Sequence, residues 1–179
     1  QSQSGGELKP SRLVIDQSIP KILAQLDPVW GGLGTGMKFP QVSVFRFLLQ
    51  SGDPKAIEAV LKTCGHMMDG GIYDQVMGGF HRYAVDREWL VPHFEKMLYD
   101  QAQLMELYLD AWQVTGEEKF REVVVGIADY VLRELTHPEG GFYCAQDAQS
   151  EGKEGKCFCW TEKELIALLT PEEMKVARE

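Results

Sequence analysis

The stretch "HFEKMLYDQAQLMELYLDAWQVT", residues 93–115, decides the fold class of this chain. It follows Pro92, and because proline is favourable at the first helical position, the sequence predicts a helix from His93 to about Thr115. At about 100° per residue, its apolar side chains fall on two adjacent faces that merge into an arc broader than a surface helix needs. A helix with so little polar surface is typical of the inner layer of a two-layer helical fold.

Polar residues in the first two turns of this predicted helix form a candidate site. His93, Lys96 and Asp100 stand at i, i+3 and i+7 and share the edge of the apolar arc, whereas Glu95 falls outside it. Half-buried groups of opposite charge perturb each other's pKa and mark candidate functional sites. The structural alternative is a satisfied core histidine beside an ordinary surface pair of Lys96 and Asp100.

The rest of the chain reads as helices separated by glycine pairs. Helices are predicted over 11–26, with an interruption at Pro20, over 42–52, over 54–69 after the N-cap Asp53, over 117–137, and after Thr161 and Thr170. Residues 138–161 predict a β-hairpin between an aromatic strand and "KCFCW". The stretches "DGGIYD" (69–74), "EGGFYC" (139–144) and "WGGLGT" (30–35) form a weak repeat, which favours stacked helical hairpins in an α/α toroid.

The composition is that of an ordinary globular domain, with 179 residues, 44% hydrophobic and 25% charged, and a net charge of −9. This charge argues against nucleic acid, which needs a basic stripe, and against an anionic membrane surface. No run of about eighteen apolar residues predicts a transmembrane helix. Residues 1–10 are predicted to be a flexible lead-in without signal-peptide features, and residues 11–179 one partial domain, a fragment of a longer protein.

The four cysteines indicate a reducing compartment. They are few for this length and lack the spacing of a disulfide framework, so we expect free thiols in the cytoplasm. Cys144, Cys157 and Cys159 also lack the spacing of a zinc site, and we expect neither a metal nor a cofactor.

Two further clusters carry polar side chains. "GGFHRYAVDREW", residues 78–89, offers His81, Arg82, Tyr83 and Trp89, which suit a polyhydroxylated or carboxylated ligand through bidentate hydrogen bonds and stacking. The alternative is a loop whose aromatic residues plug the core. "AQDAQSEGKEG", residues 145–155, holds the acidic residues Asp147, Glu151 and Glu154, which fit either a functional loop or a solvated turn.

The block "GGIYDQVMGGFHRYAVDREWLVPHFEKMLYDQAQL", residues 70–104, resembles the central block of the YyaL-like family, bacterial proteins related to a spermatogenesis-associated thioredoxin-like protein of animals. Residues 31–40 and 140–161 resemble the flanking blocks, so the resemblance covers about residues 28–166. It implies an all-α fold, part of an (α/α)6 toroid of the six-hairpin glycosidase type, similar to N-acylglucosamine 2-epimerases and cellobiose epimerases. About three helical hairpins, with a small β-hairpin in a loop, are expected here.

The resemblance also implies partners and site residues. The partners are a sugar-like small molecule and, in the full-length protein, a thioredoxin-like domain; uncovered inner helices predict self-association of the fragment. Matched positions place His81, Arg82, Tyr83, His93, Glu95, Lys96, Asp100 and Asp147 around the pocket. We expect catalytic roles for His81, His93, Lys96 and Asp100, and substrate-binding roles for Arg82, Tyr83, Trp89, Glu95, Asp147 and Tyr73. Family members usually have an acidic residue where this chain has Gln149, which weakens the case for a carboxylate pair there.

Three functions remain open at this point. The first is a sugar epimerase or isomerase, in which His93 or His81 removes a proton next to a carbonyl while Arg82 and Lys96 stabilise the enolate. The second is a glycoside hydrolase, which needs two carboxyl groups flanking a bond. The third is a non-catalytic scaffold or binding module that partners a thioredoxin-like domain.

Overall fold

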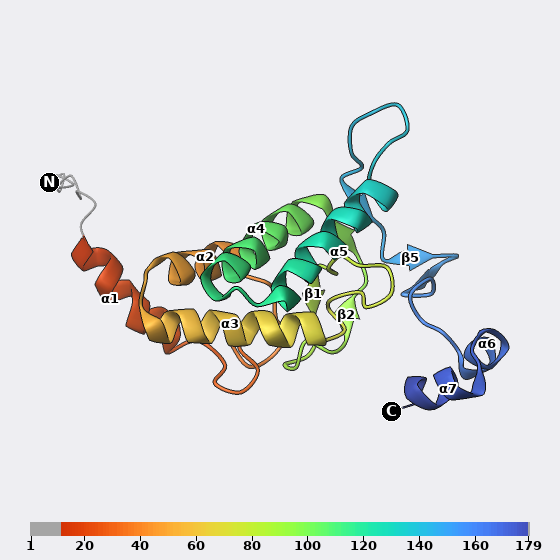
Figure 1. Ribbon diagram of the computed structural model, residues 1–179, viewed down its shortest axis with the longest axis horizontal. Coiled ribbons are helices and arrows are strands. Elements are labelled where there is room, and N and C mark those ends of the chain that lie inside the picture. The colour runs from red at the N-terminus through yellow and green to blue at the C-terminus, as the bar shows by residue number, and fades with distance from the viewer. Residues whose placement is uncertain (1–11, 179) are drawn as a thin grey trace, which may run out of the picture.

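The computed structural model describes residues 12–178 and is mostly helical, as the sequence predicts (Figure 1). Its helices are α1 (Arg12–Leu23), α2 (Val42–Gln50), α3 (Pro54–Asp69), α4 (Leu98–Thr115), α5 (Glu118–Glu134), α6 (Glu162–Leu168) and α7 (Pro171–Ala177). Its strands are β1 (Tyr83–Ala84), β2 (Pro92–His93), β3 (Lys96–Met97), β4 (Ala145–Gln146), β5 (Gln149–Ser150) and β6 (Lys153–Glu154). They pair in three antiparallel sheets, β1–β2, β3–β4 and β5–β6. The predicted lead-in, residues 1–10, lies outside the described residues.

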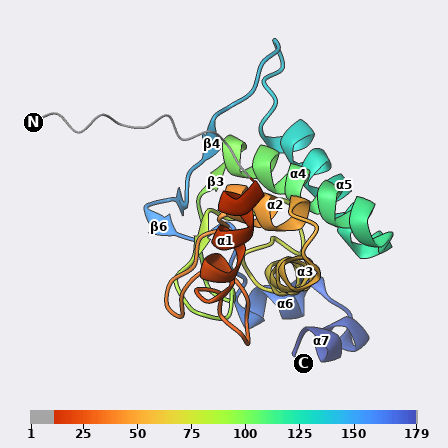
Figure 2. The same ribbon diagram turned by 90° about the vertical axis from the view of Figure 1, so that its left-hand side faces the viewer.

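The core forms where α4 packs between α2 and α5, with α3 running along α2 (Figures 1 and 2). α4 contributes Leu104, Leu107 and Tyr108, which are fully buried. The Tyr108 hydroxyl donates a hydrogen bond of 2.8 Å to the backbone oxygen of Cys64 on α3. α4 is therefore tied to three other helices, in agreement with the buried central helix that the sequence predicts.

Helix starts follow the capping signals in the sequence. The Asp53 side chain accepts the backbone N–H of Ala56 at 3.0 Å and so caps α3. Thr161 and Thr170 each open a helix with a capping box. α1 differs from the prediction, because it ends at Leu23 and continues through Pro20 without an interruption.

The start of α4 corrects the sequence prediction: the helix begins at Leu98, not at His93. The preceding segment is extended, because His93 pairs with Tyr83 and Lys96 pairs with Gln146 in two small sheets. Strand pairing with distant parts of the chain thus overrides the local helical signal.

The predicted β-hairpin is present but shorter, and it lies elsewhere in the loop. β4 pairs with β3 far upstream rather than with "KCFCW", and the hairpin is β5–β6. Glu151 and Gly152 form its turn with φ values of 52° and 74°. Two adjacent residues with positive φ are typical of the tight type I′ turn.

The glycine-pair repeat has a different register from the predicted one. In the middle loop, the glycine pair enclosed by bridging residues is Gly78–Gly79, not Gly70–Gly71. The backbone bridges that close the three equivalent loops are Leu26–Leu33, Tyr73–Phe80 and Thr136–Phe142.

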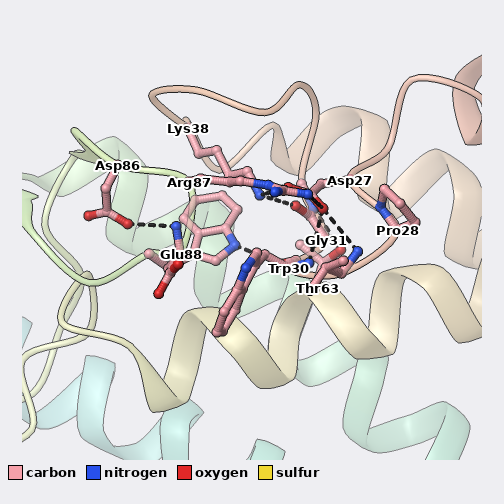
Figure 3. Close-up of polar contacts among 12 residues, drawn as sticks. Asp27, Pro28, Trp30, Gly31, Lys38, Thr63, Asp86, Arg87 and Glu88 are labelled. Carbon is pink, nitrogen blue, oxygen red and sulfur yellow. Dashed lines mark hydrogen bonds and ion pairs between the residues drawn. The ribbon is translucent and has the colours of Figure 1, made fainter.

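A buried ion pair closes the first of these loops (Figure 3). Lys38 Nζ lies 3.0 Å from Asp27 Oδ2 and donates to the Gly31 carbonyl at 2.5 Å, and both side chains are fully buried. Asp27 Oδ1 accepts the backbone N–H groups of Val29 and Trp30. The pair therefore satisfies backbone donors and an acceptor that the tight turn would otherwise leave unpaired.

The second loop repeats this arrangement. Lys96 Nζ donates to Asp74 Oδ2 at 2.7 Å and to the Gly78 carbonyl at 2.9 Å. Asp74 Oδ1 accepts the backbone N–H groups of Val76 and Met77. The repeat in the sequence thus marks a repeated ion-pair closure, in which an aspartate begins the loop and a lysine enters from further along the chain.

α6 and α7 pack on each other at the end of the molecule opposite α1 (Figure 1). α6 has no buried residue, and Leu168 and Val176 are 65% and 72% exposed. Exposed apolar surface of this kind favours association with another molecule. The expected self-association of the chain stays a prediction. Within residues 12–178, no helix is both long and apolar enough to cross a membrane.

Two alanine substitutions separate packing from backbone strain in the first loop. Gly31 and Gly34 have φ values of 66° and 78°, but an added Cβ would lie 2.8 Å from Thr63 Cα at Gly31 and would meet nothing within 4 Å at Gly34. We expect Gly31→Ala to lower the free energy of unfolding by about 3 kcal/mol and Gly34→Ala by about 1 kcal/mol. Urea unfolding followed by circular dichroism measures both, and equal losses would show that the close approach to α3 is unimportant.

Candidate functional site

The extended segment 93–97 sorts its side chains onto two sides, because successive residues of a strand point to opposite faces. His93 and Glu95 share one side, and His93 Nε2 lies 3.9 Å from Glu95 Oε2. Lys96 points to the other side, where it meets Asp74. The sequence predicted that His93, Lys96 and Asp100 share one helical face. In the structure Lys96 points away from His93, and Glu95 lies beside His93 instead.

Aromatic and acidic neighbours hold His93. Its ring stacks on Tyr83 with centroids 4.9 Å apart and planes at 21°, and Tyr83 stacks in turn on Phe39 at 4.5 Å. His93 Nδ1 lies 2.7 Å from Glu154 Oε1 on β6. Sequence reasoning selected Asp147 from this acidic loop rather than Glu154, because no local pattern shows which loop residue folds back onto His93.

Arg82 and Asp100 complete the group, which we call the strand–helix site (Arg82, Tyr83, His93, Glu95 and Asp100). Arg82 Nη1 donates to Glu95 Oε2 at 2.9 Å. Asp100 lies in the first turn of α4, and its buried Oδ2 has no hydrogen-bond partner. Burial raises the pKa of Asp100 to about 6, against the opposing effect of the Arg82 charge. A carboxyl group that binds a proton near neutral pH thus lies near an arginine–glutamate ion pair.

His81, the other predicted catalytic histidine, lies in the interior and is 2% exposed. Its Nδ1 donates to the Phe94 carbonyl at 3.0 Å, and its ring meets Phe94 and Phe158 edge-on. Burial and the charge of Lys96 lower the pKa of His81 to about 4, so this ring is neutral at pH 7. Enclosed in this way, His81 is less accessible to a substrate than His93.

Four other predicted site residues have local or core contacts. Lys96 is fully buried in its ion pair with Asp74. Trp89 is also fully buried, with a φ of 66°, and its indole N–H donates to the backbone oxygen of Trp30 in the first glycine loop. Tyr73 packs on Phe80 with centroids 4.8 Å apart. Asp147 is exposed and accepts a backbone N–H within its own loop. The structure therefore brings neither Lys96 nor Trp89 into the strand–helix site, because both side chains are used to close and fill the glycine loops.

Metal-ligating side chains are not clustered in the part of the chain that the structure describes: no group of three or more His, Cys, Asp or Glu residues there could hold a metal ion. All four cysteines are free, with Cys64 buried and the other three exposed. Burial raises the pKa of the Cys64 thiol to about 12, so this thiol stays protonated at neutral pH.

The strand–helix site combines three chemical capacities. His93 can accept a proton, Asp100 can donate one near neutral pH, and Arg82 can stabilise negative charge that develops on an oxygen. These are the groups that proton transfer next to a carbonyl requires.

Comparison with solved structures defines the class of the fold. The chain resembles cellobiose 2-epimerase from Spirochaeta thermophila with a TM-score of 0.63 and 20% identity, over 76% of this chain and 39% of that one. It resembles a family 76 glycoside hydrolase (mannosidase) from Bacteroides thetaiotaomicron with a TM-score of 0.57 and 14% identity, over 73% of this chain and 36% of that one. The chain therefore has the fold of part of an (α/α)6 toroid of the six-hairpin class, as the sequence resemblance implied.

Sequence comparison then gives the particular relative. No family model matches the chain. It is 44% identical to spermatogenesis-associated protein 20 of Rattus norvegicus over 168 residues, which are 86% of this chain and 21% of that protein. The chain is thus homologous to spermatogenesis-associated protein 20, and it spans about a fifth to a quarter of the length of the curated relatives it matches.

The raised pKa of Asp100 predicts a pH-dependent cost to stability. Below its ordinary pKa of 3.8, the Asp100 carboxyl is protonated in both the folded and the unfolded protein, so it does not change the free energy of unfolding. As pH rises above the folded pKa of about 6, the carboxyl ionises in both states, and ionisation in the buried site destabilises the folded state. We expect Asp100→Asn to raise the free energy of unfolding by about 1–2 kcal/mol at pH 8, allowing for solvent screening, and by nothing at pH 4. Urea unfolding at both pH values measures this difference.

Asp129→Asn is the matched control, because Asp129 is exposed on α5. An equal gain in this control, or a gain at Asp100 that persists at pH 4, would contradict the assignment of a buried, proton-binding carboxyl group.

Proposed function

We propose that the strand–helix site belongs to a carbohydrate-active enzyme that moves a proton next to a sugar carbonyl, as an epimerase or isomerase does. The observation that carries this proposal is the convergence of an imidazole, a guanidinium and a proton-binding carboxyl group at the start of α4. The likeness of the fold to an enzyme named as a cellobiose 2-epimerase supports the same class.

The reaction follows from the chemistry of these groups. His93 removes the proton from the carbon next to the carbonyl, the electron pair of the broken C–H bond forms a C=C bond, and the π electron pair of the C=O bond moves to the oxygen. Arg82 stabilises the resulting enolate, and Asp100 supplies a proton when the carbonyl re-forms. Protonation of that carbon on its opposite face gives the epimer. Protonation of the former carbonyl carbon, with the hydroxyl proton of the neighbouring carbon passing to the former carbonyl oxygen, gives the isomer. Proton exchange with solvent then returns His93 and Asp100 to their starting states.

Glycoside hydrolysis is the second candidate, because the two carboxyl groups of the site have different environments. Glu95 is ion-paired with Arg82 at 2.9 Å, whereas burial favours the protonated form of Asp100. A protonated acid near a carboxylate is the pattern that glycosidases use. The likeness of the fold to a mannosidase supports this alternative.

Hydrogen exchange in deuterated water separates the candidates. A protein of the full length of the relatives, carrying these residues, is incubated with reducing sugars and N-acyl sugars, and proton NMR follows the carbon next to the carbonyl. We expect exchange in the wild type and a loss of about 10²–10⁴-fold in His93→Ala, because the general base is removed. His137→Ala is the control, since this histidine contacts Tyr143 in the third glycine loop.

The other outcomes favour the other functions. Cleavage of glycosidic bonds without exchange would favour hydrolysis. Neither reaction, in protein shown to be folded, would favour a binding module that partners a thioredoxin-like domain.

A further inference from the structure

The His93 ring is constrained in two independent ways. Stacking on Tyr83, at 4.9 Å and 21°, fixes the plane of the ring. Glu154 fixes its rotation, because Glu154 Oε1 lies 2.7 Å from Nδ1, whereas Glu95 Oε2 lies 3.9 Å from Nε2. Only the first distance is that of a hydrogen bond, so one ring nitrogen has a carboxylate acceptor and the other does not.

The hairpin that carries Glu154 is itself anchored beside the site. Gly155 follows Glu154 with a φ of 71°, and its backbone N–H donates to the carbonyl of the buried Ala148 at 2.8 Å. The Phe94 ring packs so closely on Gly155 that an added Cβ would lie 2.6 Å from Phe94 Cδ2. Phe94 is the neighbour of His93 in sequence, so the same short segment supplies both the histidine and the surface that seats the hairpin.

We propose that Glu154 is the positioning residue of the site: its carboxylate holds the His93 proton on Nδ1 and leaves Nε2 as the atom that accepts the substrate proton. The role of Nε2 as the catalytic base rests on the proposed function, whereas the contact between Glu154 and His93 does not. A histidine whose tautomer is set by a partner on its other nitrogen presents a lone pair in one defined direction. Nε2 is the nitrogen that faces the Glu95–Arg82 pair, where the enolate oxygen would be stabilised.

Nitrogen-15 NMR of the histidine rings at pH 8 tests the tautomer on the 179-residue chain without any substrate. We expect the proton on Nδ1 of His93 in the wild type and on Nε2 in Glu154→Ala, because the acceptor is gone. Glu154→Gln is expected to keep the Nδ1 proton, since its amide oxygen still accepts. Glu151→Ala is the matched control in the same hairpin, because Glu151 pairs with Lys156 instead.

A second pair of variants tests whether packing of Gly155 on the Phe94 ring holds the β5–β6 hairpin in place. Gly155→Ala forces a methyl group into the Phe94 ring, whereas Gly152→Ala, at a φ of 74°, meets nothing within 4 Å. We expect the His93 tautomer to change in Gly155→Ala and to stay unchanged in Gly152→Ala. A wild-type His93 with its proton on Nε2, or a tautomer indifferent to Glu154→Ala, overturns the inference.

Activity is then measured separately on the full-length protein. We expect Glu154→Ala to lower kcat about tenfold or more with little change in KM, and Glu154→Gln to restore part of this loss. A tautomer that shifts as expected in a protein without exchange activity would overturn the proposed function and leave the positioning contact standing. Exchange that is unaffected by Glu154→Ala would overturn the positioning role and leave the proposed function standing.

Discussion

The ion pair between Lys96 and Asp74 sets the direction in which the strand–helix site faces. Lys96 is held by the Asp74 carboxylate and the Gly78 carbonyl, so its side chain must point into the second glycine loop. Because the segment before α4 is extended, alternation then places His93 and Glu95 on the opposite side. Lys96 thus acts on the proposed chemistry through geometry, without being part of the site.

A buried lysine is costly unless its charge is well paired, and desolvation lowers the pKa of Lys96. The pairing is extensive, because the ammonium also lies 4.3 Å from the centre of the Tyr130 ring. The Lys38–Asp27 pair in the first loop has a further cation, since Arg87 Nε and Nη2 lie 2.6 Å and 2.9 Å from the two carboxylate oxygens (Figure 3). This arginine is the main reason why the pKa of Asp27 lies well below its ordinary range. Two loops that join successive helices are therefore closed by the same electrostatic device.

The proposed site shows where sequence patterns stop being informative. Its residues could be selected from the sequence, because His93, Glu95, Arg82 and Asp100 lie in one polar block next to apolar helices. Their grouping could not, because a helical period puts His93 with Lys96 while an extended backbone puts His93 with Glu95. The choice between the two periods depended on strand pairing with Tyr83 and with β4, about ten and fifty residues away in sequence. Glu154 was missed as a partner of His93 for the same reason.

The sequence by itself determined the helical class, most helix starts and the relationship to spermatogenesis-associated protein 20. These depend on local signals, such as the Asp53 cap and the Thr161 capping box, and on 44% sequence identity over 86% of the chain. Only the tertiary structure decided that the glycine loops are closed by buried lysines and that Glu154 meets His93. These contacts join residues 11, 22 and 61 positions apart. The first two each close a loop between helices, whereas α4 and α5 lie between His93 and Glu154, so no local sequence pattern specifies these pairings.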